Sequence, residues 1–490
     1  MKIYISSIIM NYEEVISHII GLFLIYIFGK YINYLSQFKI NEKIKNKINK
    51  KEVEKLYNKK IINRKKIVKN KYRVGLLTNE IPPIIYGGVA TWIVNWIKMF
   101  ETSEKYDVIP IFLAYLDKPD ESFFKNYKNI RIIYKPEDIV EVFQDIDICV
   151  NNLWIALDSV KLIKRLYPDI KMLSVCHSLI KMEHLTNLGS KYTNNFLQQE
   201  LTFMYSDYVI LISNAERDYY IKFGYDKYKA IPVVIYNSYK PKFDNKNVFI
   251  NYENNNVGYI GRHVPRKRPE LPIFAVTKSK RDDISVFNMG VDFSKSGNDY
   301  WTKLGNMYKE QLNIIPFSSD KTKIDKFWSD IGVNSITGIY EPFGYTICET
   351  LDRRVPAIVQ DLDGPKEIIG DLKDNVFSYK VEKDIEKDID NFLKAVKKFW
   401  DTDPKVRKEM ADRARKALDK FRPEVIKMEW ETVLDSCLSD NKKKEIYKDI
   451  HDTNYEFNLV GIYNFLSKFK QNIMKLVNKK EKKTNKEIEI

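Results

Sequence analysis

The sequence predicts an α/β protein with two domains, each built on a parallel β-sheet covered by helices. Three observations predict this fold class. The chain has 490 residues, which is longer than a single domain with one hydrophobic core usually is. A hydrophobic content of 44% with 30% charged residues is typical of a globular chain. Short apolar runs alternate with helix-length segments from residue 72 onward, which is the pattern of buried parallel strands.

The predicted strands fall into two groups. The first group lies in a domain at 72–245 and comprises 72–77, 107–114, 129–134, 146–150, 171–176, 207–212 and 231–235. The second lies in a domain at 246–420 and comprises 256–260, 284–288, 312–316, 335–339, 355–359 and 376–379. The polar stretch 236–255 is the predicted linker, and a helix at 424–437 is expected in a crossover segment at 421–440. Ligands of open α/β sheets bind at the carboxyl ends of the strands, so chemistry is expected just after these runs.

The N-terminal end predicts a membrane anchor. Residues 15–29 form an apolar run without a charge, and about 20 apolar residues cross a bilayer core. We predict an anchor helix in residues 1–37 and a basic linker at 38–71; the alternative is a helix buried in the soluble fold. The positive-inside rule then places residues 38–490 in the cytosol.

The composition of the C-terminal residues 441–490 predicts a basic tail. Apolar residues recur there at helical spacing between lysines, which predicts an amphipathic helix able to lie on a membrane. Docking of the same apolar stripe onto the protein is an equally open alternative. The four scattered cysteines (Cys149, Cys176, Cys348 and Cys437) are expected to be free buried thiols.

The positive charge lies at the two ends rather than on the body. The formal net charge is +15, of which residues 38–73 contribute +12 and residues 441–490 contribute +5. The predicted domains are therefore almost neutral, and no zinc-finger spacing accompanies the basic segments. These features argue against a nucleic-acid-binding protein.

Two loops that follow predicted strands carry residues suited to a phosphate. Gly87 and Gly88 precede a predicted helix at 91–100, where backbone amides can approach an anion, although an ordinary turn is the alternative. Arg262 and Lys267 flank the turn after the strand at 256–260 and can clamp a diphosphate. A solvated basic loop is the alternative there, and we assign the neighbouring Arg266 and Arg268 to it.

The loop at 341–349 combines an anion site with carboxylates. Gly344 can open a helix whose first free amides point at an anion. Glu341 precedes that helix and Glu349 lies inside it, so acceptor-only oxygens suited to hydroxyl groups flank the amides. The alternative is a chance pair of acids favoured by the helix dipole. These residues predict a ligand that carries both phosphates and hydroxyls.

Across about residues 72–440 the chain resembles the retaining glycosyltransferases of the GT-B fold, specifically family 4, the glycosyl transferases group 1. The resemblance rests on Glu341 and Glu349 with Phe343-Gly344 between them, on Gly261, Arg262 and Lys267, on Gly87-Gly88, and on His177 at a strand end. It implies two Rossmann-like domains with a cleft between them. Departures occur at Thr350, Arg354 and Asp363-Gly364, the last replacing a pair of glycines, and they affect loops on the donor side.

The resemblance also implies a role for each matching residue. Arg262 and Lys267 would neutralise the donor diphosphate, while Glu341 and His177 would lie at the transferred sugar. Glu349 would bind the ribose hydroxyls. Phosphate oxygens and other donor atoms would be held by the two loops with free amides, namely Gly87, Gly88, Phe343, Gly344, Tyr345 and Thr346. The family needs no cofactor and generally no divalent metal.

We therefore predict a retaining transferase that moves a sugar from a nucleotide-diphosphate sugar to an acceptor hydroxyl. The membrane features favour a glycan or lipid-linked acceptor. The alternatives are a sugar-nucleotide epimerase of the same fold, which is disfavoured by the anchor, and a catalytically inactive sugar-binding scaffold.

Overall fold

A computed structural model describes residues 70–82, 87–116, 121–186, 195–243, 250–291 and 298–439. The predicted anchor at 1–37, nearly all of the basic linker and the basic tail lie outside these ranges. Within the part of the chain that is described, no helix combines the length and the apolar character needed to cross a membrane. The anchor and the tail helix therefore stay predictions.

The first half of the chain forms a seven-stranded sheet in the order β3-β2-β1-β4-β5-β6-β7. All neighbouring strands in it are parallel. The strands are β1 (Tyr72–Thr78), β2 (Tyr106–Leu113), β3 (Arg131–Ile133), β4 (Ile148–Asn151), β5 (Lys171–Cys176), β6 (Tyr208–Leu211) and β7 (Ile231–Val234). Val74 and Leu76 pack in one core cluster and Leu77 in another, so β1 is apolar on both faces because both are covered.

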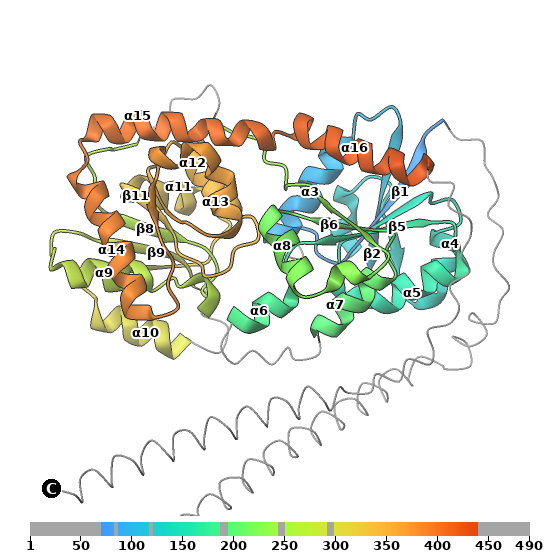
Figure 1. Ribbon diagram of the computed structural model, residues 1–490, viewed down its shortest axis with the longest axis horizontal. Helices are drawn as coiled ribbons and strands as arrows, with labels where there is room; N and C mark the ends of the chain where they lie inside the picture. The colour runs from blue at the N-terminus through green and yellow to red at the C-terminus, as the bar shows by residue number, and fades with distance from the viewer. Residues whose placement is uncertain are drawn as a thin grey trace, which may run out of the picture. The chain divides into compact units, whose positions relative to one another are not determined.

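Helices alternate with these strands (Figure 1). They are α3 (Gly88–Phe100), α4 (Ile139–Val142), α5 (Leu157–Leu166), α6 (Ile180–Thr186), α7 (Asn195–Met204) and α8 (Asn214–Lys222), with short 3₁₀ turns η1 (Glu121–Asn126), η2 (Pro136–Asp138), η3 (Trp154–Ala156) and η4 (Tyr225–Lys227). Ser213 caps α8, because its hydroxyl accepts the amide N–H of Glu216. That cap fixes where the helix begins after β6.

The second half forms a six-stranded sheet in the order β10-β9-β8-β11-β12-β13, again with parallel neighbours. Its strands are β8 (Val257–Ile260), β9 (Val286–Val291), β10 (Leu312–Pro316), β11 (Val333–Ile336), β12 (Ala357–Gln360) and β13 (Phe377–Tyr379). Each predicted strand of both groups is present, with ends that differ by a few residues. The prediction of two parallel α/β sheets is confirmed.

The helices of the second half are α9 (Leu271–Ser279), α10 (Asn298–Met307), α11 (Lys321–Asp330), α12 (Tyr345–Asp352), α13 (Asp363–Ile369), α14 (Ile385–Asp401), α15 (Pro404–Ala414) and α16 (Pro423–Ser439), with 3₁₀ turns η5 (Pro265–Lys267), η6 (Gly370–Asn375) and η7 (Arg415–Phe421). The helix predicted at 424–437 is α16. It follows the last strand of the second sheet but packs on α3 of the first half.

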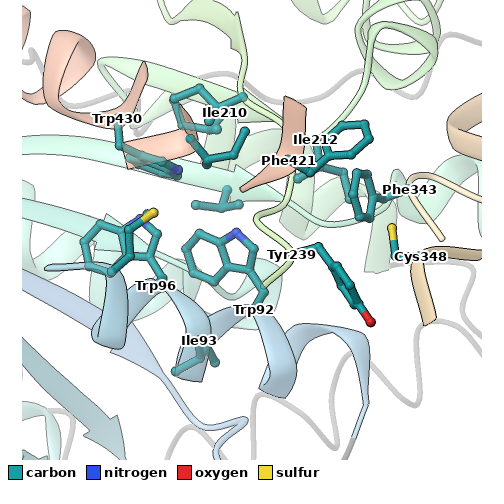
Figure 2. Close-up of a cluster of buried hydrophobic side chains, with 14 of the residues drawn as sticks. Trp92, Ile93, Trp96, Ile210, Ile212, Tyr239, Phe343, Cys348, Phe421 and Trp430 are labelled. Carbon is teal, nitrogen blue, oxygen red and sulfur yellow. The ribbon is translucent and has the colours of Figure 1, made fainter. Parts of the chain in front are cut away.

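Aromatic side chains hold α16 on α3. Figure 2 shows Trp92 and Trp96 of α3 beside Trp430 of α16, and the Trp430 ring centroid lies 5.9 Å from that of Trp92 and 5.4 Å from that of Trp96. Asp435 adds polar contacts with Tyr106 and with Lys105, whose ammonium lies 2.6 Å from the carboxylate. Phe343 and Phe421 continue the same apolar cluster on the side of the second sheet.

The predicted linker connects β7 to β8, but its first residues are buried rather than solvated. Asn237 is 3% exposed and Tyr239 is 4% exposed. The amide of Tyr239 donates to the carbonyl oxygen of Phe421 at 2.7 Å, which ties the connection to η7. The predicted domain boundary at 245/246 falls between the described ranges.

Candidate active site between the two sheets

The strand order reverses at the same place in both sheets. In the first sheet β1 and β4 are neighbours, and in the second β8 and β11 are neighbours, with later strands on one side and intermediate strands on the other. This reversal is the point where open α/β sheets bind ligands, because the loops diverge there. The loops after β1, β8 and β11 carry most of the predicted site residues. His177 follows β5, and Tyr345, Thr346 and Glu349 lie on α12.

The glycine loop of the first half meets the loop that opens α12. A Cβ atom on Gly88 would lie 3.8 Å from the Tyr345 ring, which is ordinary contact. Gly344 caps α12 with φ +108°, a conformation that strongly favours glycine. The structure therefore places the free amides at the start of α12 beside the start of α3.

Lys267 and Glu341 are in direct contact through their charged groups. The side chains are 18% and 16% exposed, so the pair is mostly withdrawn from water. Thr337 fixes the turn that carries Lys267, because its hydroxyl donates to the Lys267 carbonyl oxygen at 2.7 Å. The amide of Ile339 also donates to the carbonyl oxygen of Arg266 at 2.8 Å. The loop after β11 and the turn η5 thus form one packed unit.

The surroundings of Lys267 favour an anionic partner. Burial is the largest effect that lowers the pKa of Lys267 well below its usual value, and the guanidinium groups of Arg266 and Arg262 lower it further. Glu183 acts in the opposite direction. An anion bound among these three cations would stabilise the charged ammonium.

A cavity of about 190 Å³ lies beside Arg262, and neither Lys267 nor Glu341 is among the residues that line it. Arg262 contributes to its wall from the second half, and the remaining walls come from the first half. The polar lining residues are Glu80, Asn151, Asn152, Ser174, His177, Ser178, Glu183, Gln199, Thr202 and Arg262. Burial raises the pKa of Glu80, while the positive charge of Arg262, which also lines the cavity, lowers it.

His177 stands in the cavity as a neutral imidazole. Burial lowers its pKa to about 3. Its Nε2 atom is hydrogen-bonded to the side-chain amide of Asn152. The imidazole also lies edge-on to Trp92, with ring centroids 4.9 Å apart. His177 is thus held in one orientation, and it does not carry a charge at neutral pH.

Glu349 lies apart from these residues. It is partly buried on α12, and it is not among the residues that line the cavity. Burial raises its pKa, whereas Arg353 and Lys242 lower it. Thr346 lies in the first turn of the same helix, where its carbonyl oxygen accepts the hydroxyl of Thr350. The structure places Glu349 on α12, the helix that begins at the predicted anion site.

The assignment of Arg266 and Arg268 to a solvated loop is wrong. They are only 4% and 8% exposed. Arg266 donates to the carbonyl oxygen of Tyr340 at 3.0 Å and to the carboxylate of Glu183 at 3.2 Å, which joins the two halves beside the cavity. Arg268 pairs with the buried Asp388. The short 3₁₀ turn, which ends on Arg268 at φ +44°, directs these two cations inward.

Glu367 is a residue that the sequence reasoning did not assign to the site. It lies on α13, yet its carboxylate accepts the amide N–H groups of Asn214 and Ala215 at 2.9 and 2.6 Å, which are the first two amides of α8. The hydroxyl of Tyr236 donates to the same carboxylate at 2.7 Å. Glu80, Asn152 and Glu183 were also missed. Only the place of Glu80, two residues after a predicted strand, offered a local signal.

The described residues contain no group of three or more histidine, cysteine, aspartate or glutamate side chains that could hold a metal ion. All four cysteines are free and buried, as expected. Metal-independent chemistry stays a prediction.

Comparisons with solved structures show the fold. Sucrose-phosphate synthase from Thermosynechococcus elongatus is 14% identical, with a TM-score of 0.59, and the match covers 75% of this chain and 99% of that one. Anabaena HepE in complex with UDP and glucose is 16% identical, with a TM-score of 0.56, over 74% of this chain and 99% of that one. A TarM mutant of S. aureus in complex with fondaparinux, α-GlcNAc-glycerol and UDP is 13% identical, with a TM-score of 0.57, over 74% and 99%.

No curated protein matches the chain by sequence. Residues 241–417, which carry Arg262, Lys267, Glu341 and Glu349, match the family model of glycosyl transferases group 1. This match and the two-domain fold shared with these structures support a glycosyltransferase of the GT-B fold.

Proposed function

We propose that the protein transfers a sugar from a nucleotide-diphosphate sugar to an acceptor hydroxyl with retention of the anomeric configuration. The observation that carries the proposal is the contact between Lys267 and Glu341 beside a cavity that Arg262 and His177 line. The contact joins a cation for a diphosphate to a carboxylate for sugar hydroxyls, and the cavity adds the guanidinium of Arg262 and the neutral imidazole of His177. A nucleotide sugar carries a diphosphate and sugar hydroxyls only a few bonds apart.

The proposed chemistry gives each residue a task. The bond from the anomeric carbon to the diphosphate breaks, a bond to the acceptor oxygen forms on the same face, and the departing diphosphate takes the acceptor proton. Arg262 and Lys267 stabilise the negative charge that grows on the leaving group. The amides at the starts of α3 and α12 hold phosphate oxygens. Glu341 accepts hydroxyl groups of the sugar, and Glu349 accepts those of the ribose.

The structural neighbours support the substrate classes. One HepE structure is a complex with UDP-glucose, and the TarM complex contains UDP together with a sugar-bearing glycerol. We propose a nucleotide-sugar donor, no cofactor or metal, and a glycan or lipid-linked acceptor. The predicted anchor and basic tail support action at the cytosolic face of a membrane.

The first test is donor binding by the full-length protein. A thermal-shift panel of UDP-, GDP- and ADP-sugars should identify one nucleotide, since a ligand at about 100 times its Kd stabilises the folded state by about 2.7 kcal/mol. Absence of a shift with every donor would refute the proposal.

The second test separates transfer from the alternatives. With the identified donor, Lys267→Ala should lower kcat/KM by at least about 100-fold, the effect of removing a preorganised charge. Lys278→Ala is the matched control, because Lys278 is a solvent-exposed lysine that pairs with Asp390. Product analysis by NMR should show the donor's anomer, and EDTA should leave the rate unchanged. Release of an epimerised sugar would favour the epimerase, and full function in Lys267→Ala would favour the scaffold.

A further inference from the structure

Asp363 occupies an unusual place beside the site. It is the first residue of α13 and has φ +50°, which is rare for a residue other than glycine. It is 6% exposed. A buried carboxylate in a disfavoured backbone conformation needs specific partners, because neither burial nor backbone geometry favours it.

Both carboxylate oxygens of Asp363 have such partners. Oδ2 accepts the amide N–H of Glu341 at 3.2 Å, and Oδ1 accepts the hydroxyl of Tyr219 at 2.9 Å. The amide of the next residue, Gly364, donates to the carbonyl oxygen of Glu341 at 3.0 Å. The Asp363-Gly364 turn therefore holds Glu341 by both of its backbone polar groups.

The fit of this turn against the loop after β11 is close. A Cβ atom on Gly364 would lie 2.4 Å from the carbonyl oxygen of Phe343 and 2.6 Å from that of Pro342. Only glycine is compatible with this approach, because a side chain would force the turn away from the loop that carries Glu341. The backbone of Glu341 and the carboxylate of Asp363 are thus fixed relative to one another.

The other partner, Tyr219, belongs to the first half of the chain. It lies on α8, the helix whose first amides are capped by Glu367 of α13. Its ring also packs edge-on against Tyr340, with centroids 6.0 Å apart. Helix α8 therefore reaches the loop that carries Glu341 both through Asp363 and through Tyr340.

We propose that Asp363 is a positioning residue that makes the placement of Glu341 depend on the contact of α8 with α13. The hydrogen-bonded series runs from the Tyr219 hydroxyl through the Asp363 carboxylate to the Glu341 amide. The proposal rests on the function proposed above, because Glu341 acts there on the transferred sugar. In this role Asp363 acts through Glu341, whose amide it holds.

The charge of Asp363 gives this role a pH signature. Burial raises its pKa to about 7, the hydrogen bond from Tyr219 lowers it, and Glu367 raises it. The titratable groups that interact with it are Tyr219 and Glu216 of α8 and Glu367 of α13. The ionised carboxylate accepts both hydrogen bonds, whereas the protonated form has one oxygen that donates. The positioning of Glu341 should therefore improve as the pH rises through about 7.

The test compares Asp363→Gly, Asp363→Asn and Tyr219→Phe in the full-length protein. Asp363→Gly relieves the backbone conformation and removes both hydrogen bonds, so kcat should fall about tenfold while the affinity for the nucleoside diphosphate changes less than about twofold. Asp363→Asn retains an acceptor oxygen for the Glu341 amide, so most of kcat should return without the rise near pH 7. Lys366→Ala, an exposed residue on the same helix, is the matched control.

Hydrogen–deuterium exchange of the segment around Glu341 is the second readout, and it needs no substrate. Exchange should be faster in Asp363→Gly and Tyr219→Phe than in the wild type and in Lys366→Ala. Wild-type exchange or a wild-type kcat in Asp363→Gly would overturn the proposal. If the wild type transfers no sugar from any donor, the proposed function fails, and faster exchange would still uphold Asp363 as the residue that positions Glu341.

Discussion

Replacing Glu367 with alanine is expected to weaken the contact between α13 and α8. The carboxylate accepts the first two amides of α8 at 2.9 and 2.6 Å, the Asn214 side chain at 3.1 Å and the Tyr236 hydroxyl at 2.7 Å. All four donors come from the first half of the chain. Glu367, which belongs to the second half of the chain, therefore caps helix α8 of the first half.

The magnitude follows from the groups that lose their partner. Loss of a helix cap costs about 1 kcal/mol, and loss of a negative charge at a helix N-terminus costs about 0.5 kcal/mol. The Tyr236 hydroxyl loses a charge-assisted hydrogen bond worth about 1.5 kcal/mol. We expect Glu367→Ala to lower the free energy of unfolding by about 2–3 kcal/mol, because water can replace part of what is lost. Glu367→Gln should lose about half as much, since one oxygen remains.

Calorimetry and hydrogen exchange measure this effect. The midpoint of the thermal transition should fall by about 4 °C or more in Glu367→Ala, and the amides of Asn214 and Ala215 should exchange faster. Asp371→Asn, an exposed acid soon after α13, is the matched control. A loss within about 0.5 kcal/mol, with unchanged exchange at the start of α8, would refute the reasoning.

Two further predictions concern one glycine and one buried acid. Gly344→Ala places a side chain at φ +108°, which should cost about 1–3 kcal/mol of stability and distort the start of α12; a transfer assay with calorimetry checks it, and wild-type activity would contradict it. Burial raises the pKa of Glu216 from 4.5 to about 8. The folded state therefore binds this proton more tightly than the unfolded state does, and the resulting stabilisation is complete below pH 4.5 and is lost as the pH rises through 8. Glu216→Gln should therefore gain stability relative to the wild type between pH 5 and pH 9 in urea titrations, and parallel pH profiles would rule this out.

The predicted fold was recoverable because its signals are local. A strand buried on both faces must be apolar along its whole length, and a helix must separate it from a parallel neighbour. The runs that became β1, β5 and β6 show this without any knowledge of their partners. Gly344 was likewise predicted to open a helix, and it is the residue that precedes α12. Charge counting along the chain likewise located a near-neutral body between basic ends.

The sequence did not predict which residues the buried polar side chains contact. Arg266 was assigned to solvent, but it is buried against Tyr340 and Glu183, which are 74 and 83 residues away. Glu367 caps a helix that begins 153 residues earlier. The local sequence around a charged residue does not show whether its side chain is exposed to solvent or buried against a distant part of the chain.

The sequence by itself determined two parallel α/β sheets, the order of the motif loops and the kinds of chemical group that they carry. Only the tertiary structure decided that Lys267 contacts Glu341, that His177 is neutral against Asn152, and that Asp363 and Glu367 join α13 to α8. The physical reason is the distance along the sequence over which each signal acts. Hydrophobic periodicity is read within one element, whereas hydrogen bonds and ion pairs depend on which loops the packed sheets bring together.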